Sequence, residues 1–125
     1  MTLKKALVVD EGRCISFMGP ENMVYATPRM VSDVEYACRD FLLQHLDPGE
    51  DSVGAHVSID HLAATPPGMQ VTVEARIAEV DRRKVTFEFT VTDPIEVCGK
   101  GRHVRFVVDT AKSRERLAAK RAKAK

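Results

Sequence analysis

The hydrophobic positions of this chain follow a helical period in one segment and a strand period in most of the rest. Between residues 28 and 45 apolar residues recur every three or four positions, which predicts one long amphipathic helix. The helix should begin at Thr27-Pro28, where a threonine can cap it and a proline fits its first turn. Its apolar side comprises Met30, Val31, Val34, Ala37, Cys38, Phe41, Leu42 and Leu46.

After this helix, apolar and polar residues alternate. The alternation predicts strands over residues 53–61, 71–77 and 85–91, with a last strand over 97–108. Before the helix, Leu3–Val9 predicts a strand and Cys14–Phe17 a short second one. The inward face of the first long strand should carry Val53, Ala55, Val57, Ile59 and His61. In the last strand, one face should carry His103, Arg105 and Val107 and the other Val104, Phe106 and Val108.

One long helix followed by antiparallel strands predicts an α+β domain in which the sheet wraps around the helix. The helix must bury a wide apolar side, and each strand offers it one apolar face. The sheet would have a long edge strand with unpaired backbone groups, and such an edge needs protection. Pairing with a second copy of the chain is the simplest protection, so we expect a homodimer.

Composition narrows the class of protein. The chain has 125 residues, enough for one domain that buries a core without disulfides. Its three cysteines, Cys14, Cys38 and Cys98, form no CxxC pair, which favours a reducing compartment. Neither a membrane span nor a signal peptide is apparent, so we expect a cytoplasmic protein with no membrane partner. The cysteines have no partner at metal-ligand spacing and no nucleotide-binding signature is present, so we expect no metal and no cofactor.

Charge is distributed unevenly. The whole chain carries a net charge of +1. From Ala111 onward there are seven basic residues and one acidic residue, Glu115, so this segment carries +6 and residues 1–110 carry −5. We interpret residues 111–125 as a basic tail, a solvated terminal helix in which Leu117 is the only large apolar side chain. Nucleic-acid binding is not expected from it. Attraction of an anionic cofactor or of substrate phosphates is the other alternative.

Three polar residues stand in apolar surroundings and could carry chemistry. Glu35 falls at the edge of the apolar side of the helix, where a carboxylate must be paired, neutralised or able to reach water. His61 ends the inward face of a strand, although a histidine there can be purely structural. Thr27 is fully explained by helix capping. A hydroxyl, a carboxylate and an imidazole are nevertheless the groups that acyl-transfer chemistry uses.

Gly54 lies inside a predicted strand, where glycine weakens the element. It could allow the close approach of a substrate to the backbone, or it could mark a β-bulge. The sequence favours neither explanation.

Several segments resemble one known family. They are the run Val24-Tyr25-Ala26-Thr27-Pro28, the helical segment Val34-Glu35-Tyr36-Ala37-Cys38, the stretch from Ser52-Val53-Gly54 to His61-Leu62-Ala63-Ala64-Thr65-Pro66-Pro67-Gly68, and Gly99-Lys100-Gly101-Arg102-His103-Val104-Arg105. Together they are similar to the fluoroacetyl-CoA thioesterase family, which are small hotdog-fold acyl-CoA thioesterases. The resemblance covers roughly residues 5–110.

This resemblance implies a hotdog domain over residues 1–110, paired as a homodimer or assembled further as a tetramer, with active sites at the subunit interface. The family's catalytic threonine, glutamate and histidine fall on Thr27, Glu35 and His61. Its glycine before the histidine falls on Gly54 and an arginine of its last strand on Arg105.

The segment before the threonine departs from the family pattern. The fluoroacetyl-specific member has a phenylalanine-rich lid there, whereas Cys14–Ala26 is shorter here and offers Phe17 and Tyr25 as substrate-binding candidates. Fluoroacetyl selectivity therefore does not carry over.

The function implied is hydrolysis of a small or short-chain acyl-CoA thioester. His61 would act as general base, Glu35 would orient it or activate water, and Thr27 would supply a nucleophile or a hydrogen bond. Covalent and direct water mechanisms both stay open. The alternative function is a non-catalytic acyl-CoA-binding or regulatory hotdog module.

Overall fold

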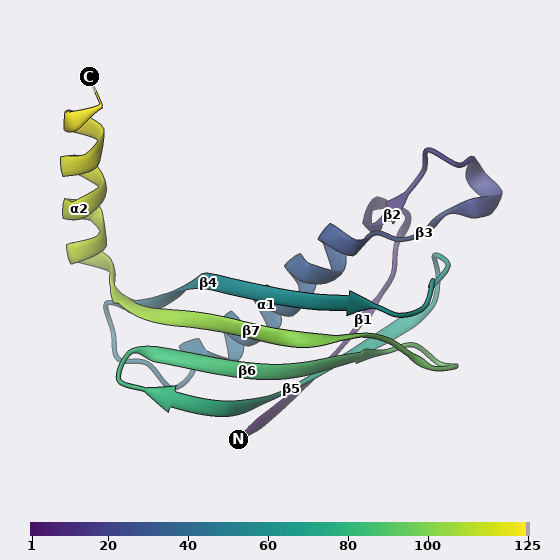
Figure 1. Cartoon of the computed structure of the whole chain (residues 1–125), viewed down its shortest axis with the longest axis horizontal. Coiled ribbons are helices and arrows are strands. Elements are labelled where there is room, and N and C mark those ends of the chain that lie inside the picture. The colour runs from purple at the N-terminus through teal and green to yellow at the C-terminus, as the bar shows by residue number, and fades with distance from the viewer. Residues whose placement is uncertain (125) are drawn as a thin grey trace.

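A computed structural model describes residues 1–124 of the chain, and Figure 1 shows its elements. The strands are β1 (Thr2–Val8), β2 (Cys14–Ile15), β3 (Val24–Tyr25), β4 (Glu50–His61), β5 (Gln70–Asp81), β6 (Lys84–Thr92) and β7 (Val97–Asp109). The helices are α1 (Thr27–Leu43) and α2 (Thr110–Lys123), with the short 3₁₀ turns η1 (Glu11–Arg13) and η2 (Pro20–Asn22).

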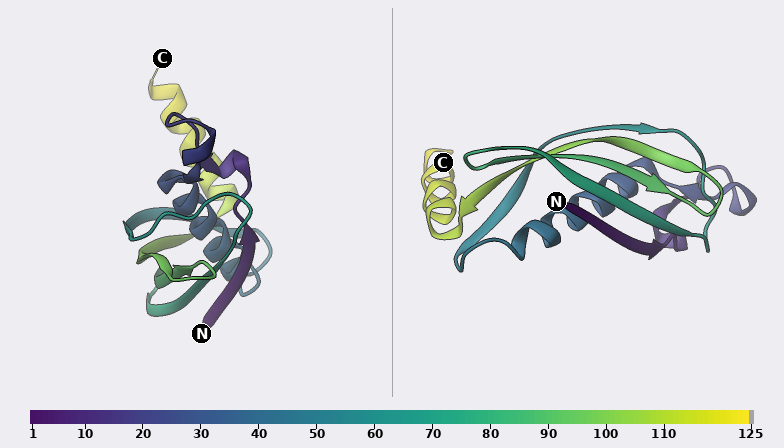
Figure 2. Two further views of the ribbon diagram at one scale, coloured as in Figure 1. Left: turned by 90° about the vertical axis from the view of Figure 1, so that its right-hand side faces the viewer. Right: turned by 90° about the horizontal axis from the view of Figure 1, so that it is seen from below.

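Five strands form one antiparallel sheet in the order β1-β5-β6-β7-β4, and α1 lies across one face of it (Figure 2). The period of two along β6 turns alternate apolar side chains toward the helix, where Val85, Phe87, Phe89 and Val91 are buried. The helix contributes Met30, Val34, Ala37, Cys38 and Leu42 to the same core. The predicted α+β arrangement, with a sheet wrapped around one long helix, is confirmed.

Close packing between helix and sheet depends on a glycine. A Cβ at Gly99 of β7 would lie 2.5 Å from Sδ of Met30, so any side chain there would force the Met30 side chain to move. Met30 is fully buried at this contact.

The start of α1 differs from the prediction. Ala26, not Thr27, is the N-cap residue, and no side chain caps the helix. Thr27 is instead the first residue of the helix. The capping interpretation of Thr27 was therefore wrong, because its hydroxyl is hydrogen-bonded elsewhere, as described below.

The inward face of β4 also differs from the prediction. The pairing of β4 with β7 shifts register between Gly54 and His56, which leaves Ala55 as the extra residue of a β-bulge. Before the bulge the face is reversed: Ser52 is buried and Val53 is 49% exposed. After the bulge, Val57 and Ile59 pack against the core as predicted. The alternation therefore failed for Val53 and Ala55, because it assumed a continuous strand.

Two segments project from this core at opposite ends of the sheet (Figure 1). The hairpin β2–β3 and its loop form a lid segment (residues 14–25) next to the start of α1. At the other end α2 leaves β7, capped by the Asp109 side chain, which accepts from the backbone N–H of Lys112. None of its residues is buried. Within residues 1–124, no helix is long and apolar enough to span a membrane.

Candidate active site

Thr27 and His61 meet at the junction of α1 and β4. The Oγ1 of Thr27 lies 2.6 Å from Nδ1 of His61, a hydrogen bond between residues 34 positions apart. They line a pocket of about 360 Å³ with Ile15 and Val24 of the lid segment and Leu62 of the loop after β4. The structure thus brings together two of the three predicted catalytic residues.

The other ring nitrogen of His61 is unsatisfied. Within the described residues, Nε2 of His61 is buried and has no hydrogen-bond partner. A buried polar atom without a partner costs stability, so such an atom is expected to meet a ligand or another group. Burial also lowers the pKa of His61, opposed by the nearby backbone of Ala63. The imidazole is therefore neutral at neutral pH and able to accept a proton.

Tyr25 fastens the lid segment to α1. Its hydroxyl donates to Oδ2 of Asp33, which also accepts from Nε of Arg13 at 3.0 Å. The Tyr25 side chain is buried, and its ring lies edge-on to the His61 imidazole with 6.5 Å between centroids. Burial, followed by the Asp33 contact, raises the pKa of Tyr25. Tyr25 thus contributes the side of its ring, not a free hydroxyl, to the pocket wall. Phe17, the other substrate-binding candidate, is 81% exposed in the lid loop.

Glu35 lies in a second pocket, farther along α1. A Cβ at Gly54 would lie 3.3 Å from Oε2 of Glu35, 3.3 Å from Cε1 of His103 and 3.6 Å from Nη1 of Arg105. The pocket is also lined by Tyr36 and Val53, which are both exposed. Absence of a side chain at Gly54 therefore lets a carboxylate, an imidazole and a guanidinium converge on one point.

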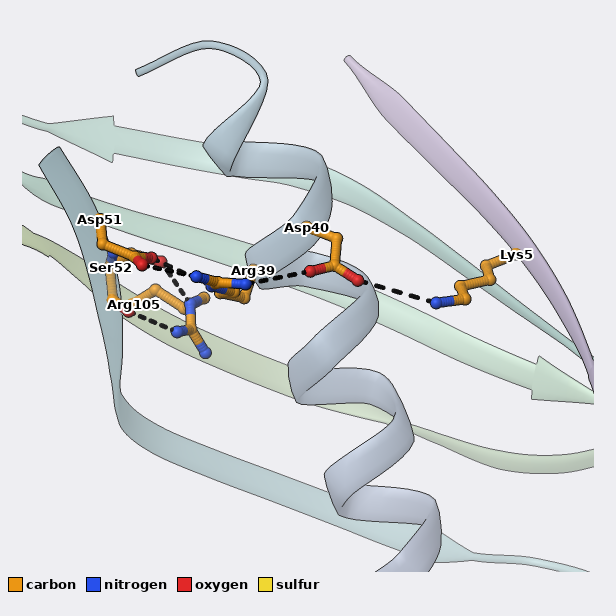
Figure 3. Close-up of polar contacts among 6 residues, drawn as sticks. All are labelled: Lys5, Arg39, Asp40, Asp51, Ser52 and Arg105. Carbon is orange, nitrogen blue, oxygen red and sulfur yellow. Dashed lines mark hydrogen bonds and ion pairs between the residues drawn. The ribbon is translucent and has the colours of Figure 1, made fainter. Parts of the chain in front are cut away.

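Arg105 is held in this pocket by Ser52. Its Nε donates to Oγ of Ser52 and its Nη2 to the Ser52 carbonyl, both at 2.7 Å. Next to them, Arg39 of α1 pairs with Asp51 through two nitrogens at 3.1 and 2.6 Å and lowers the pKa of Asp51. Figure 3 shows the contacts continuing through Asp40 to Lys5 of β1.

In one chain the two pockets are separate. The helix α1 runs antiparallel to β4, so Thr27 meets His61, Glu35 lies by Gly54 and Arg39 pairs with Asp51. Eight helical residues between Thr27 and Glu35 correspond to an axial rise of about 12 Å. In the part of the chain that the structure describes, Glu35 forms no hydrogen bond with Thr27 or His61.

Comparison with known proteins places this arrangement in a family. A family model described as fluoroacetyl-CoA-specific thioesterase matches residues 9–111. The chain belongs to this thioesterase family. It is therefore a thioester hydrolase. The fluoroacetyl-CoA thioesterase of Streptantibioticus cattleyicolor is 36% identical over 97 residues, which span 78% of this chain and 70% of that protein.

Solved structures extend the likeness over nearly the whole chain. The fluoroacetyl-CoA thioesterase FlK superposes with a TM-score of 0.87 at 31% identity, covering 96% of this chain and 94% of that one. A Thermus thermophilus protein of the thioesterase superfamily gives 0.87 at 29% identity, covering 100% and 95%. The hotdog fold expected from the resemblance is confirmed.

The sequence did not single out Ser52, which lines the Glu35 pocket of this thioesterase, or His103, whose ring lies next to Gly54. A signal for His103 was present, because the alternation of the last strand placed it on the same face as Arg105. Ser52 gave no signal, since it is turned inward by the bulge at Ala55. Among residues 1–124, no three histidine, cysteine or acidic side chains gather as a metal site.

Gly54→Ala tests the convergence of groups in the Glu35 pocket. The added methyl would meet Glu35 and His103 at 3.3 Å, so these side chains must shift by a few tenths of an ångström. We expect thioester hydrolysis to fall by about tenfold or more, with the free energy of unfolding changed by no more than about 1 kcal/mol. Thiol release and urea unfolding measure the two effects.

The matched control is Gly12→Ala, whose Cβ would meet only Oδ1 of Asp10, at 3.4 Å. It should hydrolyse thioester at the unaltered rate. Full hydrolysis by a folded Gly54→Ala variant would contradict a functional role for this convergence.

Proposed function

We propose that this thioester hydrolase cleaves small or short-chain acyl-CoA at a site that two copies of the chain share. Thr27 and His61 come from one protomer, and Glu35, Gly54 and Arg105 from the other. The observation that carries the proposal is the buried, unpartnered Nε2 of His61 beside a hydroxyl already bound to Nδ1. Relatives support the substrate class, because solved FlK variants contain acetyl-CoA in one case and fluoroacetate with CoA in another.

Pairing through β4 supports the shared site. This strand is an edge of the sheet, with β7 on one side only. Twelve residues of unpaired edge invite association with another strand. Exposed Val53 and Tyr36 beside the Glu35 pocket would be covered by a second copy.

Only one register of the two β4 strands would bring the Thr27–His61 pocket of one protomer next to the Glu35 pocket of the other. In an antiparallel pair about a two-fold axis, a residue near one end of β4 lies beside a residue near the other end of its copy. Pairing centred on Ser58, with Gly54 and Ala55 counted as one position because of the bulge, places His61 of one protomer beside Gly54 of the other. The unpartnered Nε2 and the Glu35 carboxylate would then face one cavity.

The proposed reaction has two steps. First, Nδ1 of His61 takes the Thr27 proton while Oγ1 attacks the thioester carbonyl carbon; the carbon–sulfur bond breaks, and the CoA sulfur leaves with the proton from the imidazolium. Second, water attacks the threonyl ester, with Glu35 accepting its proton. The acid is released, and the proton returns to Oγ1 of Thr27.

Alanine variants and an acyl-CoA panel test the chemistry. His61→Ala and Glu35→Ala should each lose hydrolysis by about a hundredfold or more while staying folded. Thiol release should be fastest with acetyl-CoA and other short acyl groups. Because Glu35 serves the second step, Glu35→Ala should accumulate a Thr27 ester that intact-protein mass spectrometry detects. Thr90→Ala, an exposed residue on the outer face of β6, is the control. Unimpaired turnover in either site variant would rule out the assignment.

Mixing two inactive variants tests the shared site. A dimer of one His61→Ala chain and one Glu35→Ala chain has one site with both residues intact, if each site takes residues from two chains. Random mixing after co-refolding should therefore restore about a quarter of the unaltered turnover. A site contained within one chain predicts no recovery at all.

The pH dependence of hydrolysis should report His61. Its neutral form is the active base, and burial lowers its pKa, so the neutral form persists to lower pH than in an exposed histidine. As pH falls through this lowered pKa, kcat/KM should fall, with a midpoint below about 6.5. Circular dichroism over the same range controls for unfolding. The absence of any such fall would show that the neutral form of His61 does not limit the reaction.

A further inference from the structure

His103 is a second histidine in this molecule whose two ring nitrogens both have partners. It is 1% exposed in β7, next to Glu35 and Gly54. Its Nδ1 lies 2.9 Å from the carbonyl of His56 and its Nε2 lies 3.2 Å from Nη1 of Arg105.

These partners fix the tautomer of His103. A guanidinium can only donate, so Nε2 must be the unprotonated acceptor. A carbonyl can only accept, so Nδ1 must carry the proton and donate it to His56. Burial lowers the pKa of His103 and the charge of Arg105 acts in the same direction, while the His56 carbonyl and Glu35 oppose them. The ring is therefore neutral, and its acceptor faces Arg105.

With this acceptor, every nitrogen of the Arg105 guanidinium has a partner. Ser52 accepts hydrogen bonds from Nε and Nη2, and His103 accepts one from Nη1. Glu35 lies by the same Gly54, yet within residues 1–124 no ion pair of 4.0 Å or less joins it to Arg105. Three of the five N–H donors are used in this way, and without His103 the Nη1 group would be free to turn both of its donors toward this carboxylate.

We propose that His103 is a positioning residue, which accepts Nη1 of Arg105 so that Arg105 balances the charge of Glu35 without binding it. Glu35 is thereby kept free to act on water or substrate. This inference rests on the proposed function, because it concerns how Glu35 is kept available. It assigns the functional bond to Nε2, whereas the bond of Nδ1 to His56 holds the backbone next to the Ala55 bulge.

His103→Gln and His103→Asn separate the two bonds. The Gln amide oxygen can reach the place of Nε2 and accept from Arg105, while the Asn amide can reach the place of Nδ1 and donate to His56. Using acetyl-CoA, we expect His103→Gln to keep kcat within about threefold and His103→Asn to lose about tenfold or more, with KM little changed in both. Urea unfolding compares the stability of the two variants.

A cycle with Arg105→Gln tests whether His103 acts through the arginine. The double variant Arg105→Gln/His103→Asn should then be no slower than Arg105→Gln alone. The proposal would be overturned if the fold-losses of kcat in the two single variants multiplied in the double variant. It would also be overturned if His103→Asn had a kcat equal to or higher than that of His103→Gln. Glu35→Ala in the same series separates the failures: if it keeps full turnover, the proposed function itself is wrong; if it is inactive, those results reject only the role of His103.

Discussion

The extra residue at Ala55 is the constraint on which the rest of the site depends. Successive side chains of a strand point to opposite faces, so Gly54 and His61, seven positions apart, would face opposite sides of a regular strand. The bulge adds one residue and turns both toward α1. Because α1 runs antiparallel to β4, the helix can then contact both of these positions. Thr27 lies next to His61, and Glu35 lies next to Gly54.

Polar groups in the Glu35 pocket are tolerated because they satisfy one another. Arg105 is 5% exposed, and burying an unpaired guanidinium would be costly. Ser52 and His103 accept one hydrogen bond from each of its three nitrogens, and the nearby Glu35 carboxylate offsets its charge. The pocket around Thr27 and His61 is different, since Tyr25, Asp33 and Arg13 satisfy each other and leave Nε2 of His61 open. The charges in the Glu35 pocket therefore offset one another. In the Thr27–His61 pocket, Nε2 of His61 has no partner among the described residues.

Local patterns predicted the fold well and the site less well. The stripe on α1 and the alternation along β6 gave the correct buried faces, since a period in sequence maps directly onto a face. On β4 the apolar residues Val53 and Ala55 continued the alternation of Val57 and Ile59, so the bulge was hidden in the sequence. The hydroxyl of Thr27 could not be assigned to His61 rather than to a cap, because that contact joins two elements that meet only in the folded chain.

In the proposed arrangement, pairing of two chains along the β4 edge would also complete the active site, because both pockets lie beside this strand. In a single chain Glu35 is half-buried in a pocket bordered by exposed Val53 and Tyr36, so water reaches and screens its charge. Covering that edge with a second sheet would exclude this water and strengthen every electrostatic interaction among Glu35, Arg105 and the reacting thioester. The same contact that protects the unpaired strand would therefore supply the missing partner of His61. Assembly and chemistry would then depend on one strand, and a monomer would hold all the catalytic groups without a complete site.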